Sequence, residues 1–434
     1  MMNKNFKSNK KLWKICILGN GFDLAHNLPT SYNNFLEAME TIEFYNSNKV
    51  MTFVDLFKKS LDSNNEFIIK TQKLYKTDES SFSISENDII LIKDKLSSNS
   101  WYKYFKYKQE GSRTWADFEE DIYEVLKILS KLFRNGLAES KIKKDEYYLK
   151  QNFLKDYVKI ELTETLEADF RSAYPILEIF NLALPKGKNH NNEVIIHKDL
   201  IHQELINDIS ISFNKDKIFD NLANSLFNFA KIFEDYVNIV INTLKPVKGF
   251  EFFKSMNDYQ RVYTFNYSDT FQRFYLGKNE AKPKLNYLHG EATQHNIVFG
   301  ISELENESNK DIIDSYALEL FSKANQVVKH GTDYQYLNDE KLLIDDKSAS
   351  VDYHITIWGH SLNSWDQNYI QKIFGYELKE NKPKVFINIL YYSIDNLKFL
   401  LTRLQNIIGE DILKTRIKEE RLYFNYIDSL NNIK

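Results

Sequence analysis

The spacing of apolar residues changes along the chain and distinguishes two kinds of segment. A short apolar run at residues 13–18, WKICIL, predicts a buried strand, and the glycine turn after it leads into a helix that begins at Thr30 or Ser31. Similar runs followed by turn residues return later, at residues 261–269, 284–290, 296–301, 354–362 and 384–392. Helical patterns separate several of these runs, as at residues 393–409. The two ends of the chain therefore predict a mainly parallel sheet with helices on both faces.

The middle of the chain consists mainly of long amphipathic helical patterns. Apolar residues recur at helical spacing between Trp115 and Phe133, with Gly136 placed to end that helix, and residues 219–244 follow the same pattern. Residues 184–194 are polar and predict an exposed loop. We therefore expect little strand structure in this part of the chain.

These patterns divide the chain into a discontinuous core and an insertion. We assign residues 1–56 and 251–434 to an α/β core and residues 57–250 to a large, mostly helical insertion. The charged stretch at residues 302–350 predicts a second insertion within the core.

Composition and charge narrow the class of protein. Hydrophobic residues make up 43% of the chain and aromatic residues 15%, which is too many for a disordered protein. With 57 basic and 61 acidic residues, the net charge of -4 gives no overall attraction to nucleic acid or to an anionic membrane. The single cysteine, Cys16, excludes an internal disulfide and fits a reducing compartment. We therefore predict a cytoplasmic protein that spans no membrane.

Polar residues follow the predicted strands, at the edge where ligands bind to open parallel sheets. Gly19, Asn20 and Gly21 form a turn after the first strand, where backbone N–H groups and a helix N-terminus can hold a phosphate. A strand-to-helix turn that needs a positive φ explains the same glycines equally well. The chain has no Walker-type phosphate loop, which argues against ATP hydrolysis.

Asn266 and His289 follow the next two strands. The Asn266 amide can hold a ribose hydroxyl or a water, although an asparagine here can instead cap a helix. His289 can transfer a proton near neutral pH, although a lone histidine is more often structural. Gly359 and Ser361, in WGHSL, provide another glycine turn with groups able to bind a ligand.

The order of these motifs resembles the AbiH family of bacterial phage abortive-infection proteins. The resemblance rests on ILGNGFDLAHNLPTSYNNFL, TWADFEED, YTFNYSDT, LHG, VFGI and IWGHSLNSWD, in that order along most of the chain. It implies a role in anti-phage defence, with a phage-derived trigger and a homo-oligomeric state as open questions.

AbiH proteins are in turn similar to sirtuin-like NAD-binding domains, which implies a sirtuin-like Rossmann-type core with NAD as its substrate. The resemblance implies that Asn266 and His289 are catalytic. The nucleotide contacts that it implies come from Gly19, Asn20, Gly21, Phe22, Asp23, Gly359, Ser361 and Asn388.

Two departures from the sirtuin pattern limit the expected chemistry. One cysteine cannot form the four-cysteine zinc ribbon of sirtuin deacylases, so we expect neither protein deacylation nor a metal. Phe22 and Asp23 replace a small residue and a serine, and the Asp23 carboxylate would repel a diphosphate unless it faces a ribose or caps a turn.

The resulting hypothesis is hydrolysis of NAD to nicotinamide and ADP-ribose, restrained until infection. A non-catalytic sensor that binds a nucleotide and switches a partner is the main alternative. A metal-dependent nuclease is a third, because carboxylates gather at Asp117, Glu119, Glu120 and Asp121, where a solvated helix face is the simpler explanation.

Overall fold

The structure, a computed structural model, forms two compact units. It describes residues 11–46, 49–109, 113–135, 141–143, 156–184, 193–202, 212–248, 256, 258–276, 283–302, 312–332, 351–375 and 384–427. One unit, here the core unit, comprises Met1–Ile89, Phe233–Val298 and Val327–Lys434. The other, here the helical unit, comprises Ile90–Ile232 and Phe299–Gln326. The sequence pattern placed these divisions at residues 56 and 250.

The core unit contains a six-stranded sheet in which every neighbouring pair of strands is parallel. The strands are β1 (Lys11–Leu18), β5 (Arg261–Thr264), β6 (Lys284–Tyr287), β7 (Val351–Trp358), β8 (Val385–Tyr391) and β9 (Leu422–Tyr426). Their spatial order is β6-β5-β1-β7-β8-β9. Ranked by chain position this is the order 3-2-1-4-5-6 of doubly wound nucleotide-binding folds, and the chain reverses direction across the sheet between β1 and β7. The predicted mainly parallel sheet is confirmed.

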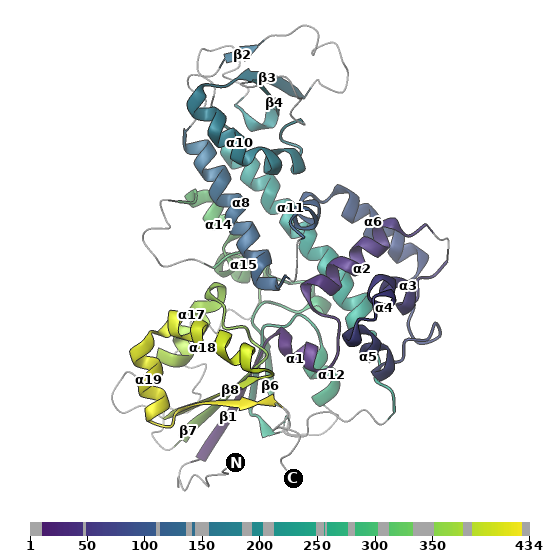
Figure 1. Cartoon of the computed structure of the whole chain (residues 1–434), viewed down its shortest axis with the longest axis vertical. Coiled ribbons are helices and arrows are strands. Elements are labelled where there is room, and N and C mark those ends of the chain that lie inside the picture. The colour runs from purple at the N-terminus through teal and green to yellow at the C-terminus, as the bar shows by residue number, and fades with distance from the viewer. Residues whose placement is uncertain are drawn as a thin grey trace. The chain divides into compact units, whose positions relative to one another are not determined.

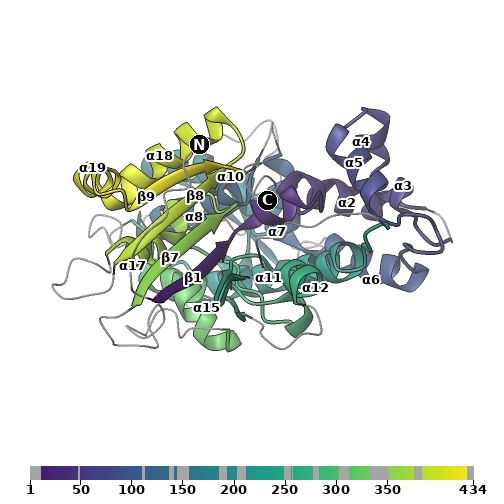
Figure 2. The same cartoon turned by 90° about the horizontal axis from the view of Figure 1, so that it is seen from below.

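Helices cover both faces of the sheet, as predicted. Ile15, Ile17 and Ile355 point to the face that packs on α17 (Gln367–Gly375), α18 (Ile394–Ile408) and α19 (Glu410–Lys418). Cys16 and Leu18 point to the other face and pack with Phe22 of α1 (Asn20–Ala25) and Phe271 of α12 (Thr270–Tyr275). Figure 2 shows β1, β7, β8 and β9 side by side, with α18 and α19 on one side of them.

Further helices of the core unit follow α1 in sequence. They are α2 (Tyr32–Phe44), α3 (Phe53–Leu56), α4 (Lys58–Asp62) and α5 (Glu66–Leu74), with short helices η6 (Ala292–Gln294) and η7 (Ser364–Asp366) at the sheet edge. The predicted helix start is confirmed at Ser31, whose hydroxyl accepts a hydrogen bond from the Asn34 N–H. Helix α18 agrees with the pattern at residues 393–409 and ends at Gly409, which has a φ of 84°.

The helical unit is built around long helices. They are α7 (Ser100–Tyr107), α8 (Trp115–Asn135), α10 (Glu164–Ile179) and α14 (Ser315–Phe321). A three-stranded antiparallel sheet of β2 (Lys141–Lys143), β3 (Tyr157–Glu161) and β4 (Glu193–His197) lies at one end of α8 and α10 (Figure 1). The sequence pattern predicted the helices but not this sheet. The predicted loop at residues 184–194 falls mostly outside the described residues, and its last two residues begin β4.

Three helices continue through the division between the units. They are α6 (Glu86–Ser98), α11 (Lys215–Tyr236) and α15 (Lys323–His330), and α11 is followed by the π-helix η4 (Val237–Ile241). None of the helices in the described ranges is long and apolar enough to cross a membrane.

The prediction of a strand at residues 296–301 was wrong. Residues 296–301 form no strand, because their backbone N–H groups bond elsewhere: that of Ile297 to the Glu234 carboxylate and that of Val298 to the His289 carbonyl. The run is apolar because it is buried, not because it pairs in the sheet. The sequence pattern also missed β9, a half-exposed edge strand.

The turns after β1 and β7 are in direct backbone contact, where the doubly wound order reverses. The Gly21 N–H donates a hydrogen bond of 2.9 Å to the Gly359 carbonyl. A Cβ atom on Gly19 would lie 2.5 Å from the His360 Cα, and one on Gly21 would lie 2.6 Å from the Gly359 Cα. A Cβ on Gly359, whose φ is +72°, would lie 2.2 Å from the Phe22 nitrogen. Only glycine allows this approach.

We predict that Gly359→Ala destabilises the protein by more than about 3 kcal/mol, because it combines a positive φ with a backbone clash. Gly331→Ala is the matched control, since Gly331 also has a positive φ of 64° but no atom within 4 Å of the added carbon. The control should cost about 1 kcal/mol. Denaturant unfolding measures both values, and equal losses for the two variants would contradict the steric argument.

Candidate functional site

The strand register brings four polar residues to one level at the carboxyl edge of the sheet. Leu18 pairs with Thr264 and with Trp358, and Thr264 pairs with Tyr287. The residues two positions further along these four strands are Asn20, Asn266, His289 and His360. Asn266 and His289 therefore occupy equivalent positions after the neighbouring strands β5 and β6, at the carboxyl edge of the sheet.

A carboxylate lies between two histidines at this edge. The His289 Nε2 atom lies 3.4 Å from the Asp366 Oδ1 atom, and the His360 Nε2 atom lies 3.3 Å from Oδ2 of the same carboxylate. Each imidazole therefore faces one oxygen of Asp366. All three residues are buried, with at most 11% of any of their side chains exposed. We call this group the His–Asp–His cluster.

The backbone sets the tautomer of one of these histidines. The Leu362 N–H donates a hydrogen bond of 3.0 Å to the His360 Nδ1 atom, so the proton of the neutral imidazole is on Nε2, the nitrogen that lies 3.3 Å from Asp366 Oδ2. The Phe265 ring packs against both imidazoles, with ring centroids 5.0 Å from His289 and 4.3 Å from His360. This apolar contact keeps water from the cluster and strengthens its electrostatic interactions.

Asp23 forms a second buried polar group, in which its carboxylate is directed at the loop after β5. The Ser268 hydroxyl donates a hydrogen bond of 2.6 Å to Asp23 Oδ2, and the Ser268 and Thr270 hydroxyls are 2.8 Å apart. Burial raises the pKa of Asp23 to about 6, against hydrogen bonds from Ser268, Thr270 and Asn266 and the charge of Arg273, all of which lower it. Asp23 thus joins the β1 turn to the segment that carries Asn266.

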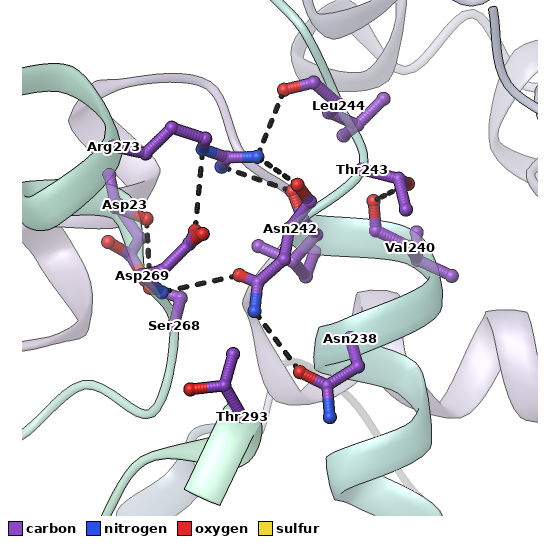
Figure 3. A network of polar contacts seen from close by, with 12 residues as sticks. Asp23, Asn238, Val240, Asn242, Thr243, Leu244, Ser268, Asp269, Arg273 and Thr293 are labelled. Carbon is purple, nitrogen blue, oxygen red and sulfur yellow. Dashed lines mark hydrogen bonds and ion pairs between the residues drawn. The ribbon is translucent and has the colours of Figure 1, made fainter.

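Arg273 and two asparagines hold this loop in place (Figure 3). The Arg273 guanidinium donates to the carbonyls of Ile241, Asn242 and Leu244, at the end of η4, and forms an ion pair of 3.3 Å with Asp269. The Asn242 side chain accepts a hydrogen bond from the Asp269 N–H, and the Asn238 side chain donates one to the Ala292 carbonyl. The end of η4 is therefore bonded to the loops after both β5 and β6.

The Asn266 side chain is buried but only partly satisfied. It stabilises the ionised form of Asp23 by hydrogen bonding, and 6% of its surface is exposed. Its Oδ1 atom is a buried acceptor with no donor within the part of the chain that the structure describes. A buried acceptor without a donor is uncommon and marks a position where a ligand or water can supply one.

The glycine turn after β1 is occupied by contacts within the chain. The Gly21 N–H bonds to Gly359 and the Phe22 N–H bonds to the Gly19 carbonyl at 2.8 Å. The Phe22 ring lies in the core, 4.9 Å from Trp358 in an edge-on arrangement. Close packing thus explains these glycines without a ligand, and their predicted contact with a phosphate remains a prediction.

Ser361 and Asn388 lie apart from the buried groups. Ser361 is exposed, and its carbonyl accepts a hydrogen bond of 3.2 Å from Arg403. Asn388 lies within β8 and pairs with Thr356, two residues before the end of β7. Its side chain accepts a hydrogen bond of 2.7 Å from the Asn425 side chain. The structure does not bring Asn388 to Asn266 or His289.

The acidic residues of α8 have separate partners. The Asp117 carboxylate accepts from the Thr114 N–H at 2.6 Å, Glu119 forms a 2.6 Å ion pair with Lys323, and Asp121 forms one of 2.7 Å with Arg113. Among the described residues, no group of three histidine, cysteine, aspartate or glutamate side chains is placed to hold a metal. These partners favour a structural role for the acidic residues.

Asp366 is the site residue that the sequence argument missed. It is the last residue of IWGHSLNSWD, six positions after His360 and not next to any predicted strand. The signal available in the sequence was a carboxylate following a histidine-containing turn on the same loop. The short helix η7 turns that carboxylate back towards the sheet edge.

Comparison with known proteins gives one match. The family model described as "Bacteriophage abortive infection AbiH" matches residues 15–389, which include every residue of the sheet-edge groups described above. No curated protein and no solved structure matches the chain.

We predict that the stability of Asp23→Asn relative to the wild type increases with pH. Because the pKa of Asp23 is raised in the folded state, the folded protein holds a proton there between pH 4 and 6 that the unfolded chain has already lost. The wild type therefore loses stability as the pH rises and this proton leaves. The neutral variant avoids this loss, so its relative stability should rise by up to roughly 3 kcal/mol between pH 4 and 7.

Urea unfolding at a series of pH values measures this difference. Ser268→Ala is the companion variant, because it removes a donor that lowers the pKa of Asp23 and should extend the pH dependence upwards. A difference between wild type and Asp23→Asn that stays constant across this pH range would show that the buried carboxyl does not titrate there.

Proposed function

The chain belongs to the bacteriophage abortive infection AbiH family, and from that premise we propose that its sheet-edge site hydrolyses NAD to nicotinamide and ADP-ribose. Family membership assigns the protein a role in bacterial defence against phage. Loss of NAD would stop the metabolism of an infected cell, which is the outcome that abortive infection requires.

One observation supports this reaction above the others. The buried Asn266 acceptor without a donor lies at the same level of the sheet edge as His289, whose imidazole faces Asp366. This edge belongs to a sheet with the strand order of nucleotide-binding folds, beside the point where that order reverses. A ribose hydroxyl is a suitable donor to Asn266, and a nearby histidine can serve the proton transfer.

The reaction breaks the bond between nicotinamide and ribose. Nicotinamide leaves with the bonding electron pair, a positive charge develops on the ribose, and a water oxygen bonds to the same carbon while its proton passes to a base. We assign that base to His289. Asp366 would orient the imidazole and stabilise its protonated form, as a carboxylate behind a catalytic histidine does. The negative charge of Asp23, beside Asn266, would favour the positively charged transition state.

The burial of these groups fits an enzyme that is inactive at rest. Asn266, His289 and Asp366 have between 4% and 9% of their surface exposed, so the reacting ribose of NAD can reach these three residues only after neighbouring loops separate, even where other parts of the nucleotide bind at the exposed surface. A toxic hydrolase must be restrained in uninfected cells, and a phage-derived trigger that separates these loops would supply the control.

We predict that His289→Ala lowers the rate of NAD hydrolysis by about 10²-fold to 10⁴-fold, the usual contribution of a general base. Asp366→Asn should lower the rate by at least about tenfold, because the imidazole loses its charged partner. His202→Ala is the matched control, since His202 is exposed and lies in the helical unit. Nicotinamide release by purified protein, with and without lysate of phage-infected cells, measures the rates.

The same variants should be tested in cells. Mass spectrometry of infected cells should show loss of NAD with the wild type and His202→Ala but not with His289→Ala. Phage protection that survives in a folded His289→Ala variant, with NAD unchanged in all strains, would rule out hydrolysis. Tight nucleotide binding without turnover would instead support a sensor that switches a partner.

A further inference from the structure

A dinucleotide at this sheet edge needs hydrogen-bond donors or a positive charge for its diphosphate. The glycine turn after β1 has few free N–H groups to offer. The N–H groups of Gly21 and Phe22 already bond to carbonyls of the chain. The nearby Asp23 carboxylate is negative when ionised and would repel a diphosphate placed directly on this turn. A diphosphate bound at this edge would therefore need a cation near the reversal point of the sheet. This inference rests on the proposed function, because it assumes a nucleotide ligand.

Arg403 of α18 is bonded to the loop at that point. Its Nη1 atom donates a hydrogen bond of 3.2 Å to the Ser361 carbonyl. Ser361 lies two residues after Gly359, the glycine in backbone contact with Gly21. The guanidinium is therefore held beside the loop that forms one side of the β1–β7 reversal, where doubly wound folds bind their ligands.

The orientation of this guanidinium is fixed from a second direction. Its central carbon lies 3.8 Å from the centre of the Phe399 ring, one helical turn earlier on α18. Stacking on an aromatic ring and a bond to a carbonyl restrict the plane of the guanidinium before any ligand binds. A planar arginine with several N–H donors suits the oxygens of a phosphate, and prior fixing reduces the entropy lost on binding.

Other cations near this edge are engaged differently. Arg273 donates to three carbonyls at the end of η4 and pairs with Asp269, so moving it would break the support of the loop after β5. Lys398, also on α18, lies on the exposed surface, 3.1 Å from Asp395. The Arg403 guanidinium, in contrast, donates a hydrogen bond directly to the reversal loop.

We propose that Arg403, with the exposed hydroxyl of Ser361, forms an anion subsite that binds the diphosphate of a nucleotide such as ADP-ribose. Arg403 supplies the charge and the planar donors, and Ser361 adds one neutral donor beside them. The subsite determines which nucleotides bind and takes no part in breaking the glycosidic bond. It therefore favours ligands with two phosphates over nucleosides that have none.

Calorimetric titration with ADP-ribose tests this subsite without depending on turnover. Arg403→Gln should weaken binding at least about tenfold, because it removes a charge-assisted contact. Arg403→Lys should retain part of the affinity, since it keeps the charge but loses the planar donors. Lys398→Gln is the matched control, because it removes one positive charge from the same helix, and its affinity should stay within about twofold of the wild type.

Thermal unfolding of each variant checks that α18 and the loop remain folded. Wild-type affinity in folded Arg403→Gln would overturn the inference, and so would an equal loss in Lys398→Gln, which would indicate only general surface charge. A wild type that does not bind ADP-ribose would overturn it as well. Binding that depends on Arg403 without any NAD hydrolysis would support the subsite and contradict the proposed reaction, so the two failures are distinct.

Discussion

The contact between the glycine turns after β1 and β7 determines how the rest of the sheet edge is arranged. The two backbones approach so closely that a single Cβ on either side would overlap the other. This approach fixes the start of α1 against the loop that begins at His360. Phe22 is then placed in the core against Trp358, and Asp23, the next residue, is directed at the loop after β5. A packing constraint thus decides which polar side chains can meet.

Two buried polar groups result. Asp23 with Ser268 and Thr270 lies towards α12, and the His–Asp–His cluster lies towards α17. Burial of a carboxylate is costly unless hydrogen bonds or opposite charges compensate. Asp23 has hydrogen bonds and the nearby charge of Arg273, and Asp366 lies between two imidazoles. Asn266 contacts the first group and lies level with the second. The buried acceptor that it retains is the point at which we propose that a ligand binds.

The sequence predicted the parts of the fold that depend on local pattern. Strands and turns at the carboxyl edge follow from apolar runs that end in glycine or polar residues, which is why Asn266 and His289 were correctly placed at one edge. The sequence pattern placed the divisions at residues 56 and 250, whereas the compact units divide within α6 and α11, helices whose amphipathic pattern continues without a break. Residues 296–301 resembled a strand because burial by loops and burial in a sheet select the same apolar residues. Asp366 was missed because only the fold of η7 brings it back to His289.

The loops at the proposed site are supported by a single helical segment. The loops that carry Asn266 and His289 are bonded to η4 through Asn242, Asn238 and the carbonyls that Arg273 binds. A π-helix closes i→i+5 hydrogen bonds, and such short insertions into α-helices are frequent at functional sites. A change in the register of η4 would release several of these hydrogen bonds together, because Asn238 and Asn242 are four residues apart on the same helical segment. Opening of the edge is therefore expected to be cooperative, with both loops released at once. A site of this kind would be either closed or accessible, which suits an activity that must be absent until infection.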